Sequence, residues 1–157
     1  MNGLDRNTAT ALAAASKKVD LPDRRATTLE DLALVVKSGD GELVIGRYEK
    51  LPVKDRGQLF RDHGFDGAQH QLKPQKWLAL IDLAAISAVC GSMGCDKEYR
   101  SMSFCDTMDL CGRQSFEAQA DRLAKMVIGW SGDEEARILW NSSRAAMNRA
   151  LADLAGR

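Results

Sequence analysis

The stretch that decides the fold is KPQKWLALIDLAAISAVC, residues 73–90. Apolar residues occupy nearly every helical position in it, whereas a surface helix would show a polar face. Pro74 suits the first turn of a helix and Gly91 suits its end. The sequence therefore predicts a core helix over 74–90, surrounded by other helices. Asp82 is the polar exception, and we expect it either on a narrow wet strip or buried with a partner.

Helical patterns continue on both sides of this stretch. Capping boxes are predicted at Thr27–Glu30 and at Ser131–Glu134, each just before an apolar pattern. The last helix carries apolar or small residues three and four apart: Ala136, Trp140, Ser143, Met147, Leu151 and Leu154. Including the core helix, the predicted helices cover residues 8–19, 28–37, 52–62, 74–90, 115–130 and 131 to about 155. Because their link is short, the last two should be antiparallel neighbours.

Residues 28–48 have two interpretations. Leu29, Leu32 and Val36 recur at helical spacing, and Gly39 is a plausible helix end. Alternatively, LALVV and ELVIGRY would form a hairpin around SGDG, because Asp-Gly is a good turn pair and the flanks are β-branched. We predict a helix over 28–37 and a short extended segment over 42–48, which would need a partner strand for its backbone groups.

Length and charge limit the class of protein. The chain has 157 residues with 22 basic and 22 acidic side chains, so no net field attracts nucleic acid or an anionic membrane. The longest apolar run, Trp77–Cys90, has 14 residues, whereas a membrane span needs about 20. We expect one cytoplasmic, mainly α-helical domain over residues 1–157. It should be a bundle of five or six helices around the 74–90 helix, with a small β element near 42–48.

All four cysteines lie in one segment after the core helix, with the spacing C-x4-C-x9-C-x5-C: Cys90, Cys95, Cys105 and Cys111. Four thiolates suit zinc, but the spacing lacks the tight C-x2-C turn of common structural zinc sites. If Asp96 caps a helix through this segment, Cys105 and Cys111 lie about 240° apart, too divergent to chelate together. The cysteines then act as small buried hydrophobes. Redox chemistry is a further alternative, and disulfides are not expected in a reducing compartment.

Basic residues on the last helix are the remaining binding candidates: Arg137, Arg144 and Arg149. They would contact a protein or, as an alternative, nucleic acid, although such residues commonly form a solvated face. One of the two histidines, His63 and His70, could join the cysteines as a mixed metal ligand or form a Cys–His pair, although no local catalytic signature surrounds any cysteine.

These features predict a small non-enzymatic binding or regulatory module that contacts another protein through its helical surface. One alternative is a thiol- or metal-dependent sensor, using zinc or redox chemistry, centred on Cys90–Cys111. A second alternative is an enzyme with dispersed catalytic residues, in which Asp82 would act with His63 or a cysteine.

Overall fold

The computed structural model describes residues 27–94, 116–129 and 132–157, with 116–121 described by their backbone alone. In these residues it contains six α-helices, one 3₁₀ helix and no strand, which confirms the predicted mainly α-helical fold. The elements are α2 (Leu29–Ser38), α3 (Gly41–Glu49), α4 (Val53–Asp62), η1 (Gly67–His70), α5 (Pro74–Met93), α7 (Phe116–Ile128) and α8 (Asp133–Ala155). The predicted helix over 8–19 lies outside the described residues.

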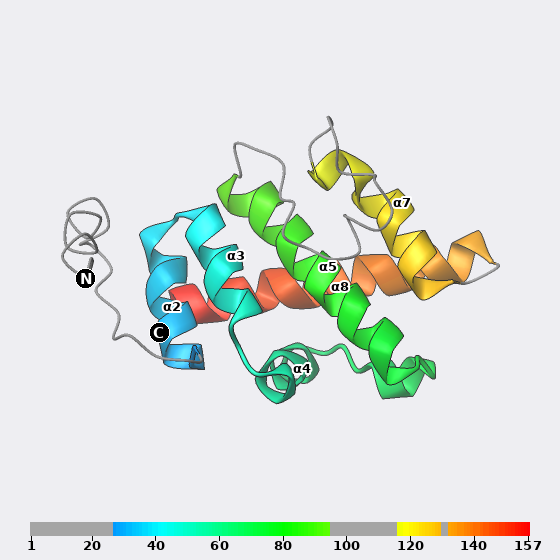
Figure 1. Ribbon diagram of the computed structural model, residues 1–157, viewed down its shortest axis with the longest axis horizontal. Helices are drawn as coiled ribbons and strands as arrows, with labels where there is room; N and C mark the ends of the chain where they lie inside the picture. Colours follow the sequence, from blue (N-terminus) through cyan, green and yellow to red (C-terminus); the bar gives the residue numbers. More distant parts are fainter. Residues whose placement is uncertain (1–26, 95–115, 130–131) are drawn as a thin grey trace, which may run out of the picture.

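Two long helices, α5 and α8, cross at the centre of the fold (Figure 1). The α5 helix contacts α3, α4, α7 and α8, as its apolar surface predicted. The α8 helix contacts α2, α4, α5 and α7, so it is a second organising helix. Figure 1 shows α2 and α3 at one end of the crossing, α7 at the other end and α4 beneath it. The predicted proximity of α7 and α8 is confirmed by their contacts.

Side chains from the described helices form one buried hydrophobic cluster. The α5 helix contributes an almost continuous buried run from Leu80 to Val89, interrupted by Asp82. All six positions predicted on α8 are buried: Ala136, Trp140, Ser143, Met147, Leu151 and Leu154. Each large apolar side chain buried in this way contributes about 1.5–3 kcal/mol to folding. The helical spacing of the sequence therefore identified the core face of α8 correctly.

The predicted extended segment over 42–48 is wrong, because these residues belong to helix α3. Gly39 ends α2 with a φ of 77°, and the Asp40 side chain accepts a hydrogen bond from the Leu43 amide at 3.1 Å. The pair that suggested a hairpin turn therefore lies in a helix-to-helix connection. Val44 and Tyr48 lie four apart and are both buried. Packing of this face outweighs the β-preference of the branched residues, which depends strongly on context.

Three predicted helix boundaries also differ from the structure. The α5 helix runs through Gly91 and ends at Gly94, whose φ is 81°. The capping box of α2 uses Thr28 and Asp31, one residue later than predicted. The N-cap of α8 is Gly132, which has no side-chain oxygen to bond a free amide. Interior glycine costs a helix about 1 kcal/mol, so packing of α5 carries it past Gly91.

Among the described residues, α5 is long and apolar enough to cross a membrane by length and composition. The helix has 20 residues, more than the apolar run read from the sequence. Half of the apolar segment of this helix is buried inside the fold, and core helices of soluble proteins meet the same criterion. Length and composition alone therefore give weak evidence for a span, and the cytoplasmic location stays a prediction.

Candidate functional site

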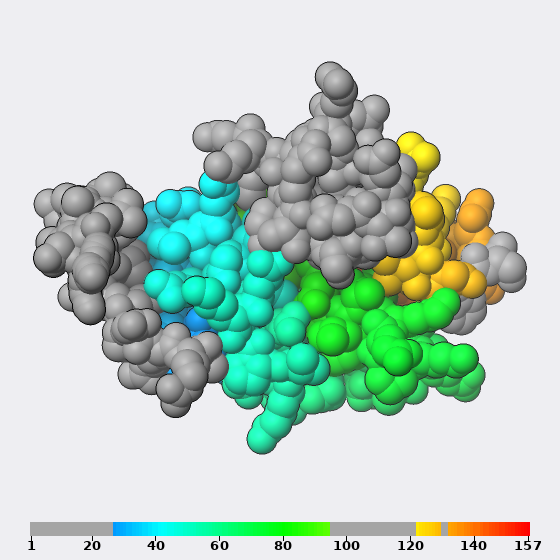
Figure 2. Space-filling model, viewed as in Figure 1, coloured from blue at the N-terminus to red at the C-terminus, as the bar shows by residue number. Residues whose placement is uncertain are grey.

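A groove of about 390 Å³ lies where α4, the η1 turn and the start of α5 meet. Figure 2 shows α4 and the first half of α5 adjoining along the lower edge of the molecule. Apolar side chains from all three segments dominate the lining, together with a few polar ones. The residues of this α4–α5 groove are Val53, Arg61, Asp66, Ala68, Leu72, Pro74, Gln75, Trp77 and Leu78. Val53 is 53% exposed although it is apolar.

The Trp77 indole packs beside two glycines that leave room for it. A Cβ atom at Gly57 would lie 2.9 Å from Cζ3 of Trp77, closer than side chains approach one another. A Cβ atom at Gly67 would overlap the five-membered part of the indole. Both glycines are buried, whereas Trp77 remains partly exposed and lines the groove. The two glycines thus let α4 and η1 close around the ring, and the position of Trp77 shapes the groove.

Two charged residues line the otherwise apolar groove. The Arg61 guanidinium lies over the Trp77 ring, 5.5 Å from its centroid, and donates a hydrogen bond to Gln58 at 3.3 Å. Asp66 accepts a hydrogen bond from the Ala68 amide at 3.0 Å. Within the described residues neither side chain forms an ion pair. Arg61 therefore offers a positive charge beside an aromatic surface, a combination frequent at binding hot spots.

A second hollow, of about 240 Å³, lies on the α8 side of the same turn. Its lining comes from the η1 turn and from the first two turns of α8. The residues of this α8 hollow are Gln69, His70, Gln71, Glu135, Ile138 and Leu139. The His70 ring stacks on Phe65 at 5.3 Å, and Gln71 has a φ of 58°. Ile138 is 49% exposed, so this hollow also has an uncovered apolar side chain.

Asp82 has two partners, which confirms one of the two alternatives expected for it. Arg56 donates a hydrogen bond to Asp82 at 2.7 Å and forms an ion pair with it. The Tyr48 hydroxyl donates to the same carboxylate at 3.0 Å, and Arg56 also donates to the Leu51 carbonyl. These contacts connect α3, α4 and α5. Removal of one partner from such a partly buried pair is destabilising, so the cluster holds three helices in place.

Burial raises the pKa of Asp82 above its ordinary value of 3.8, although the Arg56 guanidinium acts in the opposite direction. Burial also raises the pKa of Tyr48 well above 10.0, with the Asp82 charge adding to the effect. A raised carboxyl pKa is frequent in active sites, but structural ion pairs produce it too. Within the described residues Asp82 bonds to Arg56 and Tyr48, and His63 makes its contacts elsewhere. Cys95, Cys105 and Cys111 lie outside the described residues, so the enzyme alternative, in which Asp82 acts with a cysteine, stays a prediction.

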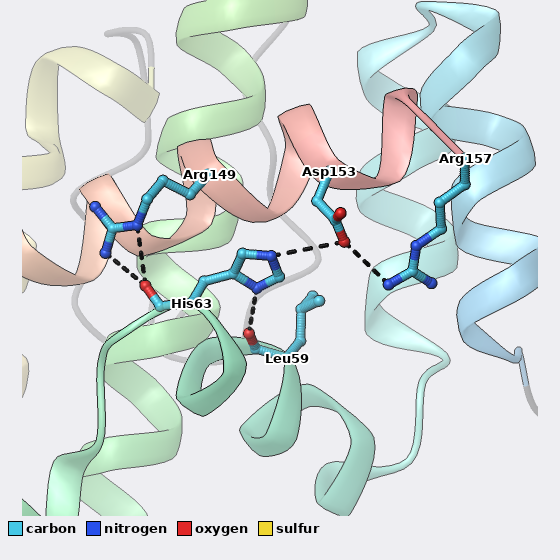
Figure 3. Close-up of polar contacts among 5 residues, drawn as sticks. All are labelled: Leu59, His63, Arg149, Asp153 and Arg157. Atoms are coloured by element: carbon cyan, nitrogen blue, oxygen red, sulfur yellow. Dashed lines mark hydrogen bonds and ion pairs between the residues drawn. The ribbon is translucent and has the colours of Figure 1, made fainter.

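His63 belongs instead to a joint between the end of α4 and the last turns of α8 (Figure 3). Its Nδ1 lies 2.9 Å from the Leu59 carbonyl oxygen, which can only accept, so Nδ1 carries the hydrogen. Its Nε2 faces an Asp153 oxygen at 3.7 Å, and Arg157 donates to that oxygen at 3.0 Å. Arg149 donates two hydrogen bonds to the His63 carbonyl. Because Arg149 satisfies a carbonyl at a helix end, the joint fixes α4 on α8.

The three arginines predicted for binding have different environments. Arg137 is exposed and paired with Glu134 at 2.7 Å, within the same helix. Arg144 lies over the Trp140 ring, 5.7 Å from its centroid. Arg149 contacts α4 through the His63 carbonyl, as described above. A binding role of these arginines stays a prediction, although two of them already make contacts that stabilise the fold.

Of the four cysteines, the structure describes Cys90, which is partly buried on α5. Cys95, Cys105 and Cys111 lie outside the described residues, so neither zinc ligation nor packing is tested for the set. Within the described ranges, no group of three or more His, Cys, Asp or Glu side chains is arranged to hold a metal ion. The zinc and redox hypotheses for Cys90–Cys111 therefore stay predictions.

Neither hollow was indicated directly by the sequence. Their linings join short pieces of chain that are distant in sequence, and the contacts of Trp77 with Gly57 and Gly67 follow no fixed spacing. One usable signal was Gly57 itself, because glycine inside a helical pattern often has a packing reason. Val53 and Ile138 were a second signal, since each is apolar where the helix pattern turns toward solvent.

Comparison of this chain with protein-family models, with curated proteins and with solved structures finds no match to any of them.

Proposed function

We propose that this chain is a non-enzymatic binding module whose α4–α5 groove accepts an apolar segment of a partner protein. The observation that carries the proposal is the exposed Val53 beside partly exposed Leu72, Trp77 and Leu78, all in one groove. Apolar side chains gathered in a hollow lose unfavourable contact with water when a partner covers them. The groove volume falls within the range of ligand sites, roughly 300 to 1,000 Å³.

Arg61 supports a protein segment as the occupant. Tryptophan and arginine are enriched among the residues that dominate protein interfaces, and here the two side chains contact each other. The guanidinium at the groove would orient a segment with an acidic residue next to its apolar one. The cluster of Tyr48 and Asp82 lies outside the groove lining and has its hydrogen bonds satisfied within the fold. That arrangement favours binding over catalysis at the groove.

Photo-crosslinking in the cells that produce the chain tests this function. A photoreactive phenylalanine analogue replaces Val53 in one variant and Leu34 in a control variant. Leu34 is similarly exposed, at 48%, but lies on α2 and outside both hollows. We expect position 53 to give a discrete cross-linked protein that position 34 does not give. Equal labelling from both positions, in variants with wild-type helicity, would contradict the proposed function.

A further inference from the structure

The α4–α5 groove and the α8 hollow flank the same short turn. Asp66, Ala68 and Leu72 line the groove, whereas Gln69, His70 and Gln71 line the hollow. Along the chain, the three hollow residues lie between Ala68 and Leu72 of the groove, so the two sites adjoin at η1. A partner centred on this turn would therefore cover both sites at once.

The two sites also complement each other in chemistry. The groove has an apolar lining with the charges of Arg61 and Asp66, while the hollow has the exposed Ile138 and the carboxylate of Glu135. Within the described part of the chain, neither Arg61 nor Glu135 forms an ion pair. Glu135 and Ile138 are three residues apart on α8 and so lie on one helical face. The hollow thus carries the apolar and acidic pair that the groove would accept.

We infer that the partner at the groove is a second copy of this chain, an inference that rests on the proposed function. In a twofold dimer, each contact between one residue of the first copy and another residue of the second copy occurs twice, because the two copies exchange roles. With the axis near η1, Ile138 of each copy enters the groove of the other and Glu135 pairs with Arg61. Arg61 and Glu135 then find partners, and the exposed Val53 and Ile138 are covered.

Charge reversal with the full-length chain tests this arrangement. Sedimentation velocity over a concentration series measures the dimer dissociation constant of the wild type, of Arg61→Glu and of Glu135→Arg. Each variant alone places like charges at both contacts, so we expect its dissociation constant to rise at least about tenfold. An equimolar mixture of the two variants places opposite charges at both contacts, so dimers should return to within about threefold of the wild type.

Substitution of exposed apolar residues by aspartate provides a second measurement and a control for folding. Ile138→Asp should abolish the dimer, and Leu34→Asp should leave the dissociation constant unchanged, because Leu34 lies outside both hollows. Circular dichroism and the midpoint of thermal unfolding identify any variant that has lost its fold. If a single reversal fails to fold, the Ile138→Asp and Leu34→Asp pair still decides the question.

The outcomes separate this inference from the proposed function. A wild-type chain that sediments as a monomer at every concentration overturns the dimer, as does a mixture of variants that stays monomeric. If position 53 still crosslinks to a different protein in cells, the proposed function stands and only its partner was wrong. If position 53 gives no protein crosslink and the chain is a monomer, both proposals fail.

Discussion

Substitution of Gly67 by alanine tests how the groove is shaped. The added methyl group would overlap the Trp77 indole, and a displacement of a few tenths of an ångström cannot relieve that overlap. The indole therefore has to leave its position between α4 and η1. Gly67 has no positive φ, so the backbone accepts alanine and the steric conflict is the main effect. The expected result is a loss of stability together with a deformed groove.

The expected loss of stability depends on how deeply Trp77 is buried. Overpacking costs about 1–3 kcal/mol in a tight core, and complete loss of a buried tryptophan side chain costs about 3–5 kcal/mol. Trp77 is only partly buried, so we expect Gly67→Ala to lower the free energy of unfolding by about 2–4 kcal/mol. Gly57→Ala should cost less, about 0–2 kcal/mol, because its contact is milder and alanine favours a helix.

Urea denaturation of the three glycine variants measures these differences. Gly46→Ala is the matched control: nothing lies within 4 Å of its added Cβ atom, so helix propensity should raise the stability by about 0.5–1 kcal/mol. In a Trp77→Ala background the cost of Gly67→Ala should fall below about 0.5 kcal/mol. A Gly67→Ala variant as stable as the wild type, or a cost unchanged without the indole, would refute the packing argument.

Three further predictions concern residues outside the groove. Because burial raises the pKa of Asp82, the folded chain holds this proton more tightly than the unfolded chain, and the free energy of unfolding should fall as pH rises above 3.8. Urea titrations between about pH 4 and pH 7 should show that Asp82→Asn removes this fall, so the free energy of unfolding of the wild type should decrease with pH relative to that of the variant. A wild type that instead gains stability relative to Asp82→Asn as the pH rises would contradict this prediction. Arg149→Ala should cost about 1–1.5 kcal/mol through its lost bonds to the end of α4, whereas Arg137→Ala should leave the free energy of unfolding nearly unchanged because Arg137 is exposed, and equal costs would refute this difference. The spacing of Cys90–Cys111 favours packing, so protein purified without added metal should contain no stoichiometric zinc, and about one zinc per chain, lost together with helicity on chelation, would contradict this.

The sequence predicted those features of the fold that depend on local periodicity. The apolar pattern over 74–90 indicated a core helix, and the spacing on α8 identified its buried face. The same reasoning failed over 42–48, where branched residues and an Asp-Gly pair suggested a strand. There the buried face of α3 decides the conformation, and that face becomes visible only once α2 and α5 are in place.

The candidate site depended on contacts that no local pattern contains. Asp82 was recognised as an anomaly, but its partners Arg56 and Tyr48 lie 26 and 34 residues away and carry no motif. The groove depends on Gly57 and Gly67 together with an indole from another helix. Such a site is a property of tertiary packing, so the sequence did not indicate its location, and the class of function stays a prediction.

Hydroxyl-radical labelling of side chains tests most directly whether a protein covers the groove in the cell. The oxidation of Val53, Leu72 and Trp77 is compared between the chain in its own cells and the purified chain at high dilution. Leu34 and Met126 serve as references, since both are exposed and outside the two hollows. We predict that the groove residues are protected in cells by at least about threefold relative to the references. Equal oxidation in both states would contradict the proposed function.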